Sequence, residues 1–178
     1  LPPGYRADDL DDLSPTAKNL ARNRYFAHIR AHKQWKQGIQ GYLASIYFAD
    51  AMLGRVLDAL KKGPHADNTI VALWSDHGWH LGEKEHWQKF TTWRVCSRVP
   101  LILRAPKGVP GLTDGTRPGE CSRPVNLRSL APTLLELCGL SPRKGHDGPS
   151  LVPLLRNPKA AWPHVALTHL HHPGSYGL

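Results

Sequence analysis

The sequence predicts an α/β fold built on a largely parallel sheet. Three observations predict it: a helical pattern over residues 33–62, a continuous apolar run at residues 70–74, and a second apolar run at residues 99–104. Helices joined to buried strands by short turns are typical of α/β proteins. Ligands of such proteins gather beyond the carboxyl ends of the strands, so we expect the functional residues there.

The N-terminal part of the chain is predicted to form a surface loop followed by two helices. Residues 1–13 are rich in proline and then in aspartate. Ser14 and Pro15 fit an N-cap and a first helical turn, and we expect one short helix from there to about Ile29. Apolar residues then recur at helical spacing over residues 33–62, and Gly63-Pro64 ends this long amphipathic helix.

The two strands and the later elements follow from similar patterns. An uninterrupted apolar run such as residues 70–74 is typical of a strand buried on both faces, and Pro100 stands at the entrance of the second strand. Beyond them we expect loops at residues 105–124 and 141–150, a helix at 127–137 ended by Gly139, and a helical turn at 151–155. The tail from Pro158 onward is expected to be irregular, and it contains His164, His169, His171 and His172.

Composition excludes several classes of protein. The chain has 178 residues, room for one domain or part of a larger one, and 40% of them are hydrophobic, which argues against wholesale disorder. No apolar run approaches the roughly 20 residues of a membrane helix. The three cysteines lack zinc-finger spacing and are too few for a disulfide scaffold. A net charge of +9 favours anionic ligands, but no nucleic-acid motif appears, so no nucleic-acid partner is expected.

The segment after the first strand is the most informative part of the sequence. Asp76 and His77 follow the buried run directly, and Gly78 lets the backbone turn sharply. Asp76 supplies a hard oxygen for a divalent cation and His77 adds a nitrogen. The alternative is that Asp76 only caps a turn while His77 packs in the interior.

Charged and titratable residues continue through residues 80–89. Lys89 is a compact positive charge that could neutralise an oxyanion near a metal, although most such lysines are only solvated. His80 and His86 are candidate proton donors to a leaving group, with a structural role as the alternative for each. Glu83 and Glu85 are candidate acid–base groups, or partners of nearby cationic side chains.

A series of motifs resembles the type I sulfatases of the alkaline phosphatase superfamily, and within them iduronate-2-sulfatase and its bacterial relatives. The resemblance covers roughly residues 40–155. It rests on Tyr42-Leu43-Ala44-Ser45-Ile46, Trp74-Ser75-Asp76-His77-Gly78, Leu81-Gly82-Glu83, His86-Trp87-Gln88-Lys89, Arg98-Val99-Pro100-Leu101-Ile102, Leu130-Ala131-Pro132-Thr133-Leu134 and Asp147-Gly148-Pro149-Ser150-Leu151. It implies an alkaline phosphatase-like α/β sandwich with a mostly parallel central sheet, present here only in part.

The resemblance also implies a role for each matching residue. Asp76 and His77 match two ligands of a calcium ion, and many sulfatases have Asn in place of His77. Lys89 matches the lysine that holds the sulfate ester, as a substrate-binding and catalytic residue, and His86 lies in the same loop as a second catalytic candidate. In this family a formylglycine hydrate attacks sulfur, the alcohol leaves, and the sulfated hydrate then expels sulfate.

Some elements of the family pattern are missing. Formylglycine forms within a Cys-x-Pro-Ser-Arg type motif, and neither Cys96-Ser97-Arg98 nor Cys121-Ser122-Arg123 has its proline. The early Asp-Asp calcium pair and the C-terminal strand segment are also not found. Residues 1–178 are therefore expected to be the central to late portion of a sulfatase catalytic domain, without its nucleophile segment, and inactive alone.

The expected function is calcium-dependent hydrolysis of a sulfate ester, on a sulfated small molecule or a glycan such as an iduronate-2-sulfate. Two alternatives stay open: a phosphatase or phosphodiesterase of the same superfamily, and a non-catalytic fragment that binds polyanions. By analogy with the family, the expected location is periplasmic, secreted or lysosomal. No membrane partner is expected, and the sequence does not indicate an oligomeric state.

Overall fold

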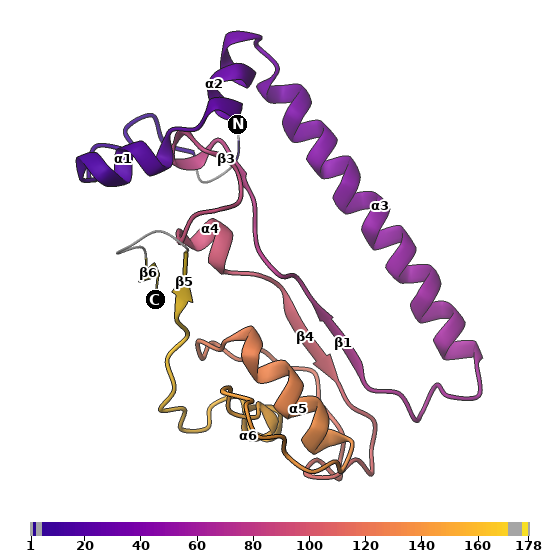
Figure 1. Cartoon of the computed structure of the whole chain (residues 1–178). Coiled ribbons are helices and arrows are strands. Elements are labelled where there is room, and N and C mark those ends of the chain that lie inside the picture. Colours follow the sequence, from indigo (N-terminus) through magenta and orange to yellow (C-terminus); the bar gives the residue numbers. More distant parts are fainter. Residues whose placement is uncertain (1, 3–4, 171–175, 178) are drawn as a thin grey trace. The chain divides into compact units, whose positions relative to one another are not determined.

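The computed structural model of the chain describes residues 2, 5–170 and 176–177, and these form two compact units that alternate along the sequence (Figure 1). Unit 1 comprises Leu1–Lys62, His77–Val99 and Leu170–Ser175. Unit 2 comprises Gly63–Asp76, Pro100–His169 and Tyr176–Leu178. The chain therefore passes from unit 2 to unit 1 between Asp76 and His77, the two predicted metal ligands.

Two short helices open unit 1, α1 (Pro15–Ala21) and α2 (Arg24–Ala31). Ser14 caps α1 as predicted, with its hydroxyl accepting a hydrogen bond from Ala17 N at 3.3 Å. The prediction of one helix over this stretch is wrong, because Asn23 forms a second N-cap and accepts from Phe26 N at 2.9 Å. The extended backbone of Asn23 starts a new helix there.

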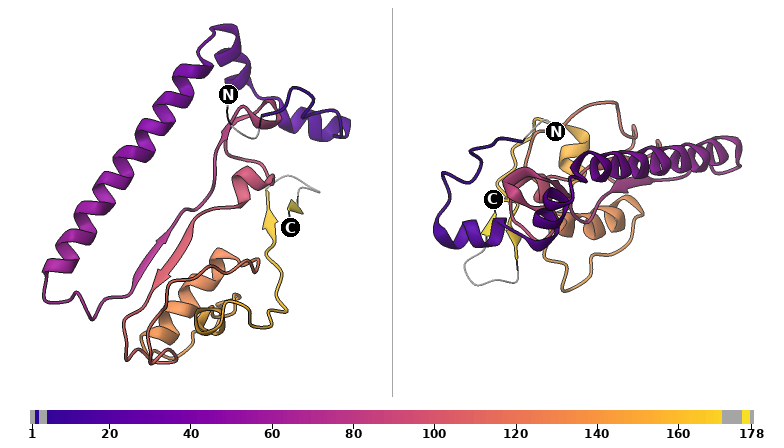
Figure 2. Two further views of the ribbon diagram at one scale, coloured as in Figure 1. Left: turned by 180° about the vertical axis from the view of Figure 1, so that it is seen from behind. Right: turned by 90° about the horizontal axis from the view of Figure 1, so that it is seen from above.

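The third helix of unit 1 is α3 (Trp35–Lys62), which confirms the long helix and its end before Gly63 (Figure 2). It has 28 residues, and none of them is buried. Several large apolar side chains are exposed along it, among them Ile46, Tyr47 and Val56. No helix among the described residues is long and apolar enough to cross a membrane.

A small hairpin in unit 1 carries most of the predicted site residues. Its strands are β2 (His80–Leu81) and β3 (Trp87–Gln88), which pair antiparallel with His80 opposite Gln88. The 3₁₀ turn η1 (Glu83–Glu85) joins them, and the short helix α4 (Arg94–Ser97) follows. Lys89 lies immediately after β3, where the hairpin ends.

Two strands form the sheet of unit 2, β1 (Val71–Trp74) and β4 (Leu101–Arg104), and they lie side by side in Figure 1. Both were predicted as strands. They pair antiparallel, with Val71 opposite Arg104 and Trp74 opposite Leu101. In this structure the strands are not buried on both faces, since Trp74 is 49% exposed and Ile102 58% exposed.

The hydrophobic core of unit 2 lies around η2 (Leu127–Ser129), α5 (Leu130–Leu137) and α6 (Val152–Arg156). Its buried members are Ala105, Leu112, Leu137 and Val152. A polar contact joins α5 to the start of α6: the hydroxyl of Thr133 donates to Ser129 O at 2.5 Å and accepts from Leu151 N at 2.8 Å.

The tail is more regular than predicted. Thr168–His169 (β5) pairs antiparallel with Tyr176–Gly177 (β6). The predicted long loop at residues 105–124 contains only one isolated bridge, between Val109 and Leu112. Of the tail histidines, His171 and His172 lie outside the described residues.

Candidate active site

The predicted metal ligands lie on the segment that follows β1. Asp76 is exposed and belongs to unit 2, while His77 is half-buried and belongs to unit 1. His77 Nδ1 lies 2.9 Å from the Gly78 carbonyl oxygen, which only accepts, so Nδ1 carries the proton. With the proton on Nδ1, Nε2 is the ring nitrogen of His77 that would bind a metal.

The donor set for a metal ion is incomplete among the residues that the structure describes. No group of three or more His, Cys, Asp or Glu side chains arranged to hold a metal occurs among the described residues. Calcium takes six to eight oxygen ligands, and Asp76 and His77 offer one carboxylate and one imidazole. These two residues fit part of a ligand shell and do not form a calcium site by themselves.

Lys89 is half-buried in unit 1 and lies at the end of the hairpin. Its Nζ is 5.2 Å from the centre of the Phe90 ring, a cation–π distance. Within the described part of the chain, no carboxylate forms an ion pair with Lys89. The positive charge is therefore not neutralised by a neighbour, as a group that binds an anion requires.

The backbone around Lys89 is strained. Gln88 has φ +83° and Phe90 has φ +70°, and earlier in the hairpin Lys84 and Glu85 have φ +56° and +51°. Residues with a Cβ avoid this left-handed region, at a cost of roughly 1–2 kcal/mol each. Such conformations persist only where the surroundings hold them, and they cluster at functional sites.

Ion pairs with the N-terminal segment hold the turn of the hairpin. Lys84 Nζ lies 2.9 Å from an Asp9 carboxylate oxygen, with both side chains only 16% exposed. Burial lowers the pKa of Lys84, but hydrogen bonding and attraction to Asp9 outweigh it, so the net pKa is raised. Glu85 accepts from Arg22 at 3.2 Å and from Arg30 at 3.3 Å, which favours its structural interpretation over an acid–base role.

Side chains at the starts of α2 and α3 also donate hydrogen bonds to backbone carbonyls of the hairpin. The side-chain amide of Asn23 donates to Trp87 O at 2.5 Å, and the indole of Trp35 donates to Leu81 O at 2.6 Å. Gly82 has φ +125°, and a Cβ there would collide with the Trp35 ring. Asp9, Asn23 and Trp35 were not among the predicted site residues, although an acidic run upstream of a cationic loop is a signal that could have indicated the Asp9 contact.

His80 is buried in unit 1 and electrically neutral. Its Nδ1 donates to Glu83 O at 3.0 Å, and its Nε2 accepts from the Thr91 hydroxyl at 2.7 Å. Burial lowers the pKa of His80 to about 4, and the positive charge of His86 adds to this effect. The one ring proton of His80 is engaged by Glu83 O and the ring is buried, which favours its structural alternative.

His86 is also buried, with a side chain 5% exposed. Its Nδ1 lies 2.7 Å from Ala21 O and its Nε2 lies 2.9 Å from Lys89 O. Its role as a catalytic residue stays a prediction. In this structure both ring nitrogens are occupied by main-chain carbonyl oxygens.

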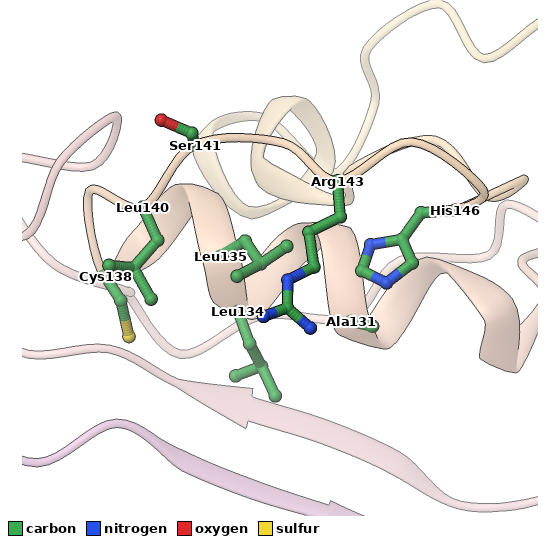
Figure 3. Close-up of a pocket in the computed structure, with 8 residues that line it drawn as sticks. All are labelled: Ala131, Leu134, Leu135, Cys138, Leu140, Ser141, Arg143 and His146. Atoms are coloured by element: carbon green, nitrogen blue, oxygen red, sulfur yellow. The ribbon is translucent and has the colours of Figure 1, made fainter.

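A hollow of about 480 Å³ in unit 2 lies over α5 and contains none of the predicted site residues (Figure 3). Leu134, Leu135 and Leu140 form its apolar wall, and Arg143 and His146 lie side by side above them. The predicted site residues therefore lie in a different part of the sequence from the residues that line this hollow. Most of them belong to unit 1.

Comparison with known proteins places these features in one family. The family model described as Sulfatase matches residues 5–140. A protein named sulfatase from Formosa agariphila is 40% identical over 157 residues, which are 86% of this chain and 30% of that protein. Human iduronate 2-sulfatase is 37% identical over 119 residues, 57% of this chain and 22% of that protein. The chain thus spans less than a third of the length of these relatives.

Solved structures give the same picture. A protein determined in complex with its substrate, D-glucosamine-2-N,6-O-disulfate, superposes with a TM-score of 0.63 and 27% identity, over 90% of this chain and 31% of that chain. A structure titled as a putative sulfatase from Bacteroides thetaiotaomicron superposes with a TM-score of 0.71 and 22% identity, over 97% and 38% of the two chains.

Proposed function

This chain belongs to the sulfatase family, and we propose that its protein hydrolyses sulfate esters on a sulfated carbohydrate in a calcium-dependent reaction. The predicted membership of this family is confirmed, as is the alkaline phosphatase-like fold, present here in part. The residue roles, the metal and the substrate are the proposal.

The observation that carries the proposal is the lysine at the end of the constrained hairpin. Lys89 has a cationic side chain without a carboxylate partner among the described residues, on backbone that its surroundings hold in a strained conformation. A fixed cation that faces no counter-ion stabilises the charge on sulfate oxygens as the ester bond breaks. We assign Lys89 to hold the sulfate group of the substrate.

We assign Asp76 and His77 to the ligand shell of the calcium ion. Asp76 offers a carboxylate and His77 a ring nitrogen, and both follow a strand end, as predicted. When bound, calcium supplies positive charge that polarises a sulfate oxygen. Further ligands, and the formylglycine that the family uses as nucleophile, would come from outside the described residues.

A sulfated carbohydrate is the proposed substrate because of the relatives and the charge of the chain. Relatives are named for sulfated sugars, such as N-acetylglucosamine-6-O-sulfatase of Bacteroides thetaiotaomicron and iduronate 2-sulfatase. The net charge of +9 attracts polyanions of this kind. By analogy with the family we also propose a periplasmic, secreted or lysosomal location.

Hydrolysis of 4-nitrophenyl sulfate by the full-length protein tests the role of Lys89. Removing a charged group that stabilises an oxyanion costs about 100-fold or more in rate, so we expect that loss in kcat/KM for Lys89→Ala. Lys36→Ala is the matched control, because it removes the same charge from an exposed position on α3 and is expected to leave kcat/KM unchanged. Undiminished turnover in Lys89→Ala would refute the assignment.

Three further measurements test the metal and separate the alternatives. Chelation is expected to abolish turnover, and calcium is expected to restore it with a lower apparent affinity in Asp76→Asn than in the wild type. Faster hydrolysis of 4-nitrophenyl phosphate than of the sulfate would favour a phosphatase instead. Tight binding of a sulfated glycan by the full-length protein without any hydrolysis would favour a polyanion-binding role.

A further inference from the structure

The two strained residues that flank Lys89 need something to hold the backbone between them. Gln88 and Phe90 both lie in the left-handed region, so the main chain turns abruptly on either side of Lys89. Side chains on such backbone point in a direction that an ordinary strand or turn would not give. Without a restraint the segment would relax to common backbone angles and the lysine would move away.

The imidazole of His86 contacts the backbone at Lys89 from within unit 1. His86 Nε2 lies 2.9 Å from Lys89 O, and His86 Nδ1 lies 2.7 Å from Ala21 O, at the last residue of α1. Because carbonyl oxygens only accept, both ring nitrogens donate, and the imidazole bridges the end of a helix to the backbone of Lys89. The ring is almost fully buried, so water does not compete for these bonds.

The surroundings of His86 restrain the ring itself. The ring of His80 lies 4.9 Å away in an edge-on arrangement, and His80 is fixed by Glu83 O and the Thr91 hydroxyl. His80 is neutral, so the two adjacent imidazoles do not repel each other as two cations would. The hairpin is thus held on both sides of Lys89, by His86 at the carbonyl of that residue and by the pair of His80 and Thr91 beyond it.

We infer that His86 is a positioning residue: it donates one hydrogen bond to Ala21 O and one to Lys89 O, and so aims the Lys89 side chain at the sulfate group. The inference rests on the proposed function of Lys89 and replaces a proton-donor role for His86. The ring has no nitrogen left for substrate while both bonds are made. Its contribution to turnover passes through the lysine.

A double-mutant cycle in the full-length protein tests this, with kcat/KM for 4-nitrophenyl sulfate as the measurement. Small misplacement of a group that binds the reacting part of a substrate costs up to about 100-fold, so we expect His86→Gln to lower kcat/KM roughly 10- to 100-fold. In a Lys89→Ala background the same substitution is expected to cost less than about twofold, because there is no lysine left to aim.

Leu137→Ala is the control for a general loss of stability. Leu137 is 1% exposed and belongs to the core of unit 2, outside the hairpin, so this variant is expected to lower the melting temperature and leave kcat/KM unchanged. Equal losses from His86→Gln in both backgrounds would overturn the positioning role alone. A normal rate in Lys89→Ala would overturn the role of Lys89, and the inference with it.

A measurement on the unmodified chain covers the case in which His86→Gln does not fold. With ¹⁵N-labelled histidine, we expect both ring N–H groups of His86 to give slowly exchanging NMR signals, since each proton is buried in a hydrogen bond. A single ring proton on His86 would mean that one of the two bonds is absent and would overturn the bridge.

Discussion

The hairpin of unit 1 and the helical core of unit 2 are stabilised in opposite ways. The hairpin, taken from here on with the three residues that follow it (residues 80–91), is held by hydrogen bonds and ion pairs. Their partners are far away in sequence, such as the Ala21 carbonyl and Asp9. The core around α5 is held by apolar burial, with Leu137 and Val152 almost fully covered. The hairpin contains four of the five non-glycine residues with positive φ among the described residues, and the core contains none.

This difference shows what each kind of contact is suited to. Apolar packing is non-directional and gains free energy in proportion to buried area, which makes it the main source of stability. Hydrogen bonds contribute less net stability each but fix direction and distance, so they can hold a strained backbone in one geometry. The hairpin therefore has the properties of a site, and the α5 core those of a scaffold.

The largest expected effect on stability lies in the scaffold. Leu137→Ala removes a side chain that is 1% exposed, and we expect the free energy of unfolding to fall by about 3 kcal/mol because a cavity remains. Leu140→Ala, at a residue 58% exposed, is the control and should change it by less than about 0.5 kcal/mol. Chemical denaturation measures both, and equal losses would contradict the location of the core.

A pH effect of intermediate size is expected in the hairpin. The pKa of His80 falls from 6.5 to about 4 on folding, so the unfolded chain binds the proton at a higher pH than the folded chain does. The free energy of unfolding therefore falls as pH drops from about 6.5 to about 4, by on the order of 2 kcal/mol between about pH 7.5 and about pH 4.5.

His80→Gln isolates this contribution from that of the other histidines. The variant should lose less stability than the wild type over the same pH interval, as measured by chemical denaturation at both pH values. A drop identical in the two proteins would show that His80 is not held neutral in the folded hairpin.

The smallest expected effect concerns the ion pair at the turn of the hairpin. Asp9→Asn leaves the half-buried ammonium of Lys84 with a weaker partner, and we expect a loss of about 1.5 kcal/mol, between the values for exposed and buried pairs. Asp8→Asn is the matched control: Asp8 pairs with Arg6 in full contact with solvent, and no measurable change is expected. Thermal unfolding of the two variants side by side would show whether burial makes the difference.

Sequence patterns predicted the elements whose determinants are local. The spacing of apolar residues and the Gly63-Pro64 pair gave the long helix and its end, and the apolar runs gave β1 and β4. The split between α1 and α2 was missed because Asn23 forms a cap inside a stretch that otherwise has a helical pattern. The antiparallel pairing of β1 and β4 could not be predicted, because a continuous apolar run does not encode strand direction or partner.

The residue types of the candidate site stay a prediction from the sequence, and the contacts that position them were not predicted. The motif from Asp76 to Lys89 indicated an anion and metal site, since carboxylate, imidazole and lysine follow a strand end. The contacts that hold this hairpin come from residues more than 40 positions away, such as Trp35 and Asp9. Contacts over that distance in sequence leave no periodic pattern, so reading the chain locally could not find them.

The left-handed residues of the hairpin also change how substitutions should be chosen there. In a helix or strand, glycine weakens the structure because it gains freedom when the chain unfolds. At Gln88 and Phe90 a glycine would adopt the required φ without steric conflict. It would therefore relieve the backbone strain that the surrounding hydrogen bonds now maintain. Glycine substitutions chosen to raise the melting temperature would therefore remove this strain and leave the Lys89 side chain less precisely positioned. Such variants would gain stability and lose activity.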